Sequence, residues 1–231
     1  MNDRSRTLIE LAGFVTLAVV SKVIVDPLSW RFSGPVTLLF TLVVLTLYLR
    51  RRQLRWSSFG LIRLSSGRAR WLLLPQTLLV IVTILGTGLV VGFAGEASGL
   101  AFMQPDAEAV NERWGELEGN LPLYLVWLTL GWVSSGFAEE MFFRGYLVSR
   151  LRGALDAVRG APVLAVVIPA LIFGHGHTYY QGLRGLVITG SIGIAMGTLF
   201  LLYRRNLWPL ILAHGTVSTL SFTALFAGWD I

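Results

Sequence analysis

The sequence predicts an all-α, polytopic membrane protein, a helical bundle of about seven transmembrane helices with its N-terminus on the cytoplasmic side. Three observations predict this fold. Hydrophobic residues make up 54% of the 231 residues and charged residues only 14%, which is too little polar surface to cover a soluble domain of this length. Several stretches of about 18 or more mostly apolar residues are long enough to cross a bilayer. The basic residues lie in alternate connections between these stretches, as the positive-inside rule requires.

Seven apolar windows are the expected spans. They cover residues 7–25, 34–49, 71–93, 121–147, 162–181, 186–203 and 207–226. The first window has no small-residue cleavage site behind it and ends at Asp26-Pro27, so we expect a retained anchor and not a signal peptide. We expect one membrane domain. Residues 1–120 would supply N-terminal helices with a basic inner and an acidic outer loop, and residues 121–231 the part that carries the motifs described below.

The distribution of charge favours a cytoplasmic N-terminus in a cytoplasmic-type (plasma) membrane. With that orientation the inner segments hold 15 of the 19 basic residues, and the outer loop 94–120 is acidic. The fifteen are Arg4, Arg6, Arg50, Arg51, Arg52, Arg55, Arg63, Arg68, Arg70, Arg144, Arg150, Arg152, Arg159, Arg204 and Arg205. The net charge of +6 therefore reflects topology, with lipid headgroups as partners and no nucleic acid. The chain has no cysteine, which excludes disulfides and thiolate chemistry.

The apolar stretch GFAEEMFFRGYL (residues 136–147) contains three charged residues. A charge near the centre of a bilayer costs about 3 kcal/mol or more, so it needs a partner or a cavity. Glu140 and Arg144 are spaced i, i+4 and can pair on one helical face. Glu139 lies about 100° around the helix and is left to face something else. The structural alternative is a buried ion-pair network that only locks helices together.

Two later spans carry further polar residues in apolar surroundings. The sequence ALIFGHGHTYYQG places His175 and His177 two residues apart, on nearly opposite faces of a helix, so only one can face the same cavity as Glu139. In LILAHGTVSTLSF, His214 and Ser218 share a face at i, i+4. A carboxylate beside an imidazole can hold and deprotonate water, and an imidazole or hydroxyl can donate to an oxyanion.

We expect the residues next to these motifs to have structural roles. We expect His175 to be structural, Gly174 and Gly176 to permit close helix packing, and Tyr179-Tyr180 to belong to an interfacial aromatic belt.

Three motifs resemble those of the CAAX-protease and bacteriocin-processing (Abi) family of intramembrane proteases. Glu139-Glu140-x-x-x-Arg144 resembles its EExxxR motif, Phe173-x-x-x-His177 its FxxxH motif, and His214-x-x-x-Ser218 its HxxxN/D motif. The resemblance covers roughly residues 121–226. Each motif alone is weak, but all three in order on successive apolar spans are fairly specific.

The resemblance implies an endopeptidase, similar to CAAX prenyl proteases, that cleaves a membrane-associated peptide or protein with an activated water. Glu139 would be the general base assisted by His177, Glu140 and Arg144 would support the site, and His214 would help to stabilise the oxyanion. Ser218 stands where the family has Asn or Asp, which puts the oxyanion role and the degree of activity in question. The family is described both as metalloproteases and as glutamate proteases. A divalent metal such as zinc, with Glu139, His177 and His214 as candidate ligands, is thus left open, although HExxH is absent.

Two other classes of function fit the same residues. A proton- or cation-coupled transporter also places carboxylates and histidines at the midplane, and an inert immunity or scaffold protein could retain the constellation for binding. The expected spans also contain a geometric conflict. They place His177 about 12 Å from the depth of Glu139 and His214, so either a tilt, a kink at Pro162 or Pro169, or different span boundaries must bring it into the site.

Overall fold

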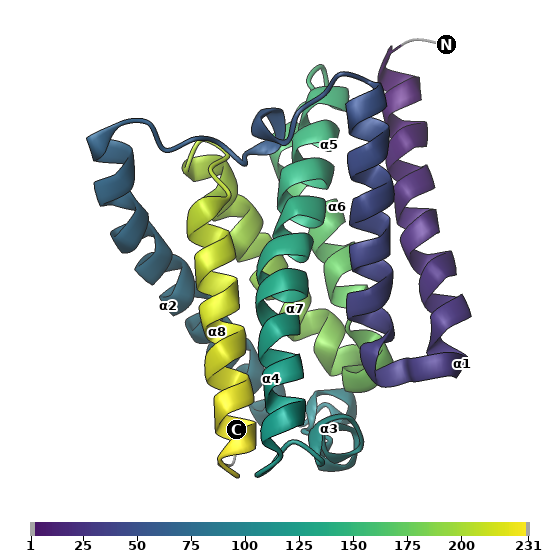
Figure 1. Ribbon diagram of the computed structural model, residues 1–231, viewed down its shortest axis with the longest axis vertical. Helices are drawn as coiled ribbons and strands as arrows, with labels where there is room; N and C mark the ends of the chain where they lie inside the picture. Colours follow the sequence, from purple (N-terminus) through teal and green to yellow (C-terminus); the bar gives the residue numbers. More distant parts are fainter. Residues whose placement is uncertain (1–2, 230–231) are drawn as a thin grey trace.

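The computed structural model describes residues 3–229, without the side chains of residues 107 and 110, and this part of the chain is helical with no strand (Figure 1). An all-α fold is therefore confirmed. The elements are α1 (Asp3–Arg51), η1 (Trp56–Phe59), α2 (Gly67–Ala97), η2 (Ala101–Met103), α3 (Ala107–Trp114), α4 (Leu121–Leu130), η3 (Gly131–Val148), α5 (Ser149–Ala154), α6 (Ala161–His175), α7 (Thr178–Leu202) and α8 (Trp208–Phe226).

Five of the described helices are long and apolar enough to cross a membrane. Two differences explain why this number is smaller than seven. The windows at 7–25 and 34–49 both lie in α1, whose backbone is non-helical at Ser29, and its two arms lie side by side (Figure 1). Helix α6 has only 15 residues, about 22 Å where a bilayer core is about 30 Å thick. With large apolar side chains such as Leu28 and Trp71 exposed, the molecule is an integral membrane protein.

The expected span 162–181 is wrong at its C-terminal boundary. Helix α6 ends at His175, the chain turns through Gly176 and His177, and α7 starts at Thr178. A second interruption follows in α7 at Gly182, where φ is 55° and ψ is −153°. His177 therefore lies in a turn between two helices, and the depth calculated for a continuous helix does not apply to it.

The long helix that carries the two glutamates starts at a defined cap. Asn120 Oδ1 accepts a hydrogen bond from the Leu123 N–H at 3.2 Å, and Pro122 occupies the first turn. The helix then continues through α4, η3 and α5, and η3 has the wider π form. Apolar periodicity did not predict this form, which occurs elsewhere mostly as short bulges at functional sites.

Glycines allow α6 and α7 to pack at backbone contact. A Cβ atom added to Gly174 would lie 2.6 Å from the Leu186 carbonyl oxygen and 2.9 Å from the Gly190 Cα. Backbone atoms cannot move aside as a flexible side chain can, so only glycine fits here. The predicted packing role holds for Gly174, whereas Gly176 lies in the turn after α6.

We expect Gly174→Ala to lower the free energy of unfolding by about 1–3 kcal/mol, because the methyl group forces α6 and α7 apart. The measurement is the thermal unfolding midpoint in detergent. Gly86→Ala is the matched control, since its Cβ would meet nothing within 4 Å and alanine is the better helix former. Equal midpoints for Gly174→Ala and the wild type would show that this contact is not tight.

Candidate active site

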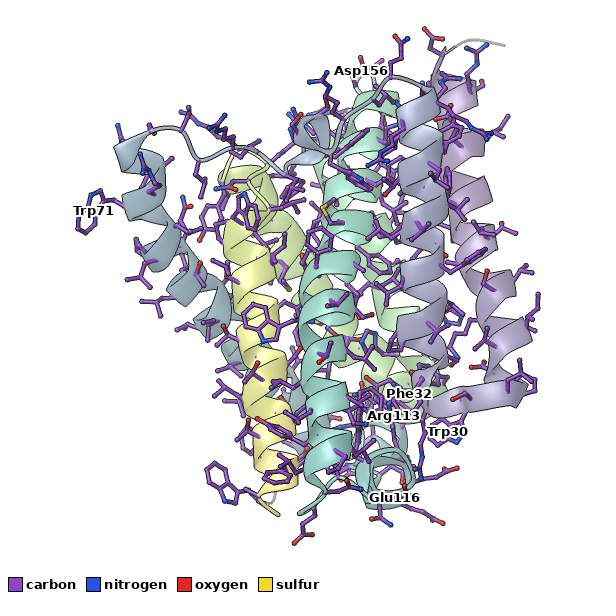
Figure 2. The ribbon with its side chains drawn as sticks, in the orientation of Figure 1. Trp30, Phe32, Trp71, Arg113, Glu116 and Asp156 are labelled. Atoms are coloured by element: carbon purple, nitrogen blue, oxygen red, sulfur yellow. The ribbon has the colours of Figure 1, made fainter. Side chains whose placement is uncertain are left out.

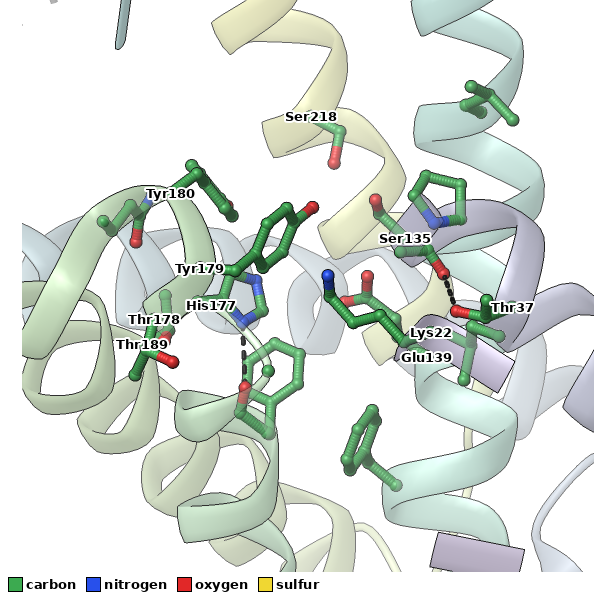
Figure 3. Close-up of a pocket in the computed structure, with 18 of the residues that line it drawn as sticks. Lys22, Thr37, Ser135, Glu139, His177, Thr178, Tyr179, Tyr180, Thr189 and Ser218 are labelled. Carbon is green, nitrogen blue, oxygen red and sulfur yellow. Dashed lines mark hydrogen bonds between the residues drawn. The ribbon is translucent and has the colours of Figure 1, made fainter. Parts of the chain in front are cut away.

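A cavity of about 710 Å³ brings residues of all three motifs together. Glu139 of η3, His177 of the α6–α7 turn, and His214 and Ser218 of α8 all line it. Figure 3 shows Glu139, His177 and Ser218 directed into the same space from three different segments. Glu140 and Arg144 do not line this cavity, and they lie buried behind its wall.

Glu140 Oε1 is the shared acceptor of a buried network. It accepts from Arg144 Nη1 at 3.0 Å and from His214 Nδ1 at 2.8 Å. The Glu140 side chain is 0% exposed and that of Arg144 2%, so both charges are neutralised inside the protein and not by water. The guanidinium of Arg144 also lies over the Phe173 ring, 4.6 Å from its centre. The i, i+4 ion pair expected from the sequence is present, and it has a third member on α8.

Glu139 is the carboxylate that remains available. Its Oε2 lies 3.7 Å from His214 Nε2, beyond hydrogen-bond distance, and this buried oxygen has no hydrogen-bond partner among the described residues. A buried carboxylate oxygen without a donor is costly unless water or a ligand supplies one. The two adjacent glutamates therefore differ in their surroundings. Glu140 is paired through Oε1 behind the cavity wall, although its buried Oε2 also lacks a hydrogen-bond partner among the described residues, whereas Glu139 lines the cavity.

His177 presents a free imidazole nitrogen in the site. Its Nδ1 lies 2.8 Å from the Phe173 carbonyl oxygen. A carbonyl can only accept, so we assign the hydrogen to Nδ1, which leaves a lone pair on Nε2. The turn after α6 gives His177 this orientation, and the early end of that helix removes the predicted conflict in depth.

Backbone contact between η3 and α8 fixes the separation of Glu139 and His214. A Cβ atom on Gly136 would lie 3.1 Å from the Gly215 Cα and from its nitrogen. Gly136 is three residues before Glu139, and Gly215 directly follows His214. Two small residues thus let the helices approach closely enough for His214 to contact both glutamates.

Several cavity residues were not predicted from the sequence. His175 lines the cavity together with His177, because the helix on which they would occupy opposite faces ends at His175. Tyr179 and Tyr180 also line it, a position that their assignment to an interfacial belt did not predict. Lys22, Asp26 and Arg113 come from α1 and α3, where no motif signalled a site. The signal present in the sequence was a charged residue in or beside an apolar stretch. These charges were interpreted only as markers of membrane topology.

The candidate metal ligands do not form a metal-binding group. Among the described residues, no cluster of three or more His, Asp or Glu side chains is arranged to hold a metal ion. Glu139, His177 and His214 share the cavity but do not converge on one point at ligand distances. No step of the chemistry below is therefore assigned to a metal.

Comparison with known families gives a match to part of the chain. Residues 121–220 match the family model described as "Rce1-like: Type II CAAX prenyl endopeptidase Rce1-like". The family resemblance predicted from the three motifs is confirmed. The Rce1-like segment runs from the start of α4 into α8 and contains every motif residue, and it points to a hydrolase of the intramembrane-protease type. Comparison with curated proteins gives no match, and comparison with solved structures gives none.

Removing Arg144 alone should be strongly destabilising. We expect Arg144→Met to lower the free energy of unfolding by about 3–5 kcal/mol, because it leaves a buried carboxylate without its cation. The double variant Glu140→Gln/Arg144→Met should recover part of the loss, as measured by denaturation in detergent. Arg31→Met is the control, since its pair with Glu116 is 31% and 67% exposed and should contribute less than about 1 kcal/mol. A double variant as unstable as Arg144→Met would instead assign the effect to packing on Phe173.

Proposed function

We propose that this protein is an intramembrane endopeptidase that cleaves a peptide bond of a membrane-associated, CAAX-type peptide or protein with an activated water. The observation that carries the proposal is the convergence of Glu139, His177 and His214 on one cavity, while Arg144 neutralises Glu140 behind it. The matched family model is described as a Type II CAAX prenyl endopeptidase, which supports the reaction class. A structural ion-pair lock alone would leave no carboxylate oxygen free inside the cavity.

The proposed reaction starts at Glu139. Its carboxylate takes a proton from a water molecule, which His177 Nε2 helps to orient, and the water oxygen attacks the peptide carbonyl carbon. Breakdown of the tetrahedral intermediate breaks the C–N bond, and the proton held by Glu139 passes to the leaving nitrogen. Atoms and charge balance with water as the only co-substrate.

Glu140 acts through His214 in this scheme. The carboxylate accepts from His214 Nδ1, which fixes the orientation of the ring, and when Nε2 also carries a hydrogen both ring nitrogens are donors. His214 then directs Nε2 toward the cavity, where it donates to the oxyanion. Ser218 lies one helical turn further along α8 and lines the same cavity, so its hydroxyl adds one donor where the family has Asn or Asp. We therefore propose positioning roles for Glu140 and Arg144 and direct roles for Glu139, His177, His214 and Ser218.

Replacing the proposed base should abolish cleavage. We expect Glu139→Gln to lower kcat on a membrane-associated peptide by roughly 10²–10⁴-fold, because the amide cannot take a proton from water. The measurement is hydrolysis by purified protein in detergent. Glu108→Gln on the exposed side of α3 is the control. Cleavage by Glu139→Gln at the wild-type rate would remove Glu139 as the base, and Glu139-dependent proton flux into liposomes without proteolysis would favour a transporter.

The proposal includes a topology of seven crossings in a cytoplasmic-type membrane with the N-terminus inside. The two arms of α1 would form two crossings, and the α6–α7 hairpin would complete the set although α6 is short. The two chain ends lie at opposite ends of the bundle, and α3 lies at the end that carries the C-terminus (Figure 1). The Arg-rich connection between α1 and α2 lies at the other end, which supports this orientation by the positive-inside rule.

The chain contains no cysteine, so single cysteines can report the topology without background. We expect a membrane-impermeant maleimide to label the Ala101→Cys variant in intact cells and the Ser65→Cys variant only after permeabilisation. Both positions are exposed, at η2 and in the α1–α2 connection respectively. The opposite labelling pattern would reverse the proposed orientation.

A further inference from the structure

Arg113 of α3 is a buried cation without a carboxylate partner among the described residues. Arg113 is 5% exposed and lines the same cavity as Glu139 and His177. Two guanidinium nitrogens, Nε and Nη1, are buried and have no hydrogen-bond partner in the part of the chain that is described. Figure 2 places Arg113 near Trp30 and Phe32, at the end of the bundle that carries the C-terminus. Buried arginine is normally paired, so these free donors indicate a missing acceptor.

Aromatic rings hold this guanidinium in place. Its central carbon lies close to the ring centres of Tyr180 at 4.2 Å, Trp114 at 4.7 Å, Tyr179 at 4.8 Å, Trp127 at 5.6 Å and Trp30 at 5.9 Å. The faces of these rings attract a cation, but they do not replace the oxygen acceptors that the N–H groups need. The cage thus fixes the position of the charge and leaves the N–H groups of Nε and Nη1 without an acceptor among the described residues.

Two nearby acidic groups are engaged with other cations, whereas Glu139 lines the same cavity and forms no ion pair with Arg113 in the described part of the chain. Asp26, which also lines the cavity, pairs with Lys22 at 2.6 Å. Glu116, shortly after α3, pairs with Arg31 at 3.0 Å. The positive charge of Arg113 is therefore available to an anion that enters the cavity.

We propose that Arg113 is a specificity-determining residue that binds a carboxylate of the substrate. The proposal rests on the proposed endopeptidase function. A guanidinium presents a planar fork of N–H donors that matches the two oxygens of a carboxylate. An unpaired, buried and rigidly held fork is suited to recognise such a group.

The position of Arg113 limits where that carboxylate lies in the peptide. The guanidinium carbon is 4.2 Å from the centre of the Tyr180 ring, which is 5.9 Å from the centre of the His177 ring. Arg113 is thus no more than about 10 Å from His177, the length of about three extended residues. A carboxylate on Arg113 belongs to a residue within about three positions of the cleaved bond. The peptide's own C-terminus and an acidic side chain near the end are the two sources that fit.

The test compares three membrane-associated peptides of one sequence, cleaved by the full-length protein in detergent. One peptide ends in a free acid, one in an amide, and one in an aspartate amide. We expect the wild type to cleave the free acid with a kcat/KM roughly 10- to 100-fold above that of the amide, the effect of a charge-assisted hydrogen bond. Full recovery with the aspartate amide would assign the anion to a side chain, and no recovery would assign it to the C-terminus. Both results support a carboxylate site.

Variants separate recognition from a structural role. Arg113→Gln should reduce the ratio of kcat/KM for the free acid to kcat/KM for the amide to about one. Arg113→Lys, which keeps the charge but loses the fork, should retain part of the preference. Arg31→Gln is the matched control at the same end of the molecule and should keep the full preference. The proposal is overturned if the wild type cleaves the acid and the amide with equal kcat/KM, or if Arg113→Gln slows both peptides equally.

A binding measurement tests the Arg113 site independently of catalysis. Trp114 and Trp127 line the cavity, so quenching of tryptophan fluorescence can follow binding of the same peptides to Glu139→Gln. Tighter binding of the free acid, lost in Glu139→Gln/Arg113→Gln, would support the Arg113 site even if the wild type cleaved neither peptide. Equal binding of acid and amide would overturn the Arg113 site while leaving cleavage by Glu139 untouched.

Discussion

One buried oxygen, Oε1 of Glu140, determines how the site is built. It accepts from Arg144 on its own helix and from His214 on α8, so the position of the imidazole depends on the ion pair behind it. Because Glu140 is wholly buried, neither donor can be replaced by solvent without a large cost in free energy. The network leaves Glu139, one residue earlier, with an unpartnered oxygen beside the same imidazole. The adjacent carboxylates therefore differ in that Glu140 is ion-paired behind the cavity wall and Glu139 lines the cavity, and the proposed role of Glu139 as the base rests on this difference.

Close backbone packing makes that geometry possible. Gly136 and Gly215 bring η3 against α8, and Gly174 and Gly190 bring α6 against α7. In a membrane, where the hydrophobic effect does not drive helices together, such contacts supply dispersion and fix crossing positions. The end of α6 at His175 then becomes useful, since a turn held against α7 can present His177 at the depth of the glutamates. A continuous span would have carried that side chain past the site.

Local spacing predicted the parts of this site that depend on one helix. The Glu140–Arg144 pair follows from its i, i+4 positions, and apolar runs located the membrane helices. Features that depend on contacts between helices were not predictable in the same way. The end of α6 lies within an apolar run that shows no stop signal beyond glycines, so the run was assigned to one span. Tyr179, Tyr180 and Arg113 had simple interpretations as interfacial or loop residues, because their sequence neighbours do not reveal that α3 and the start of α7 close over the cavity.

The arrangement divides the cavity between two parts of the chain. The Rce1-like segment supplies Glu139, His177, His214 and Ser218, whereas α1 and α3, which precede the matched residues, supply Lys22, Asp26 and Arg113. Lys22 and Asp26 neutralise each other, and among the described residues of the lining Glu139 on η3 and Arg113 on α3 keep buried atoms without a hydrogen-bond partner. A ligand that satisfies both must bring a proton donor, such as water, to Glu139 and an anionic group to Arg113. Since a peptide of about three extended residues covers the distance from Arg113 to His177, one short segment can meet both requirements, and it would join the recognition proposed for Arg113 to the chemistry proposed for the Rce1-like segment.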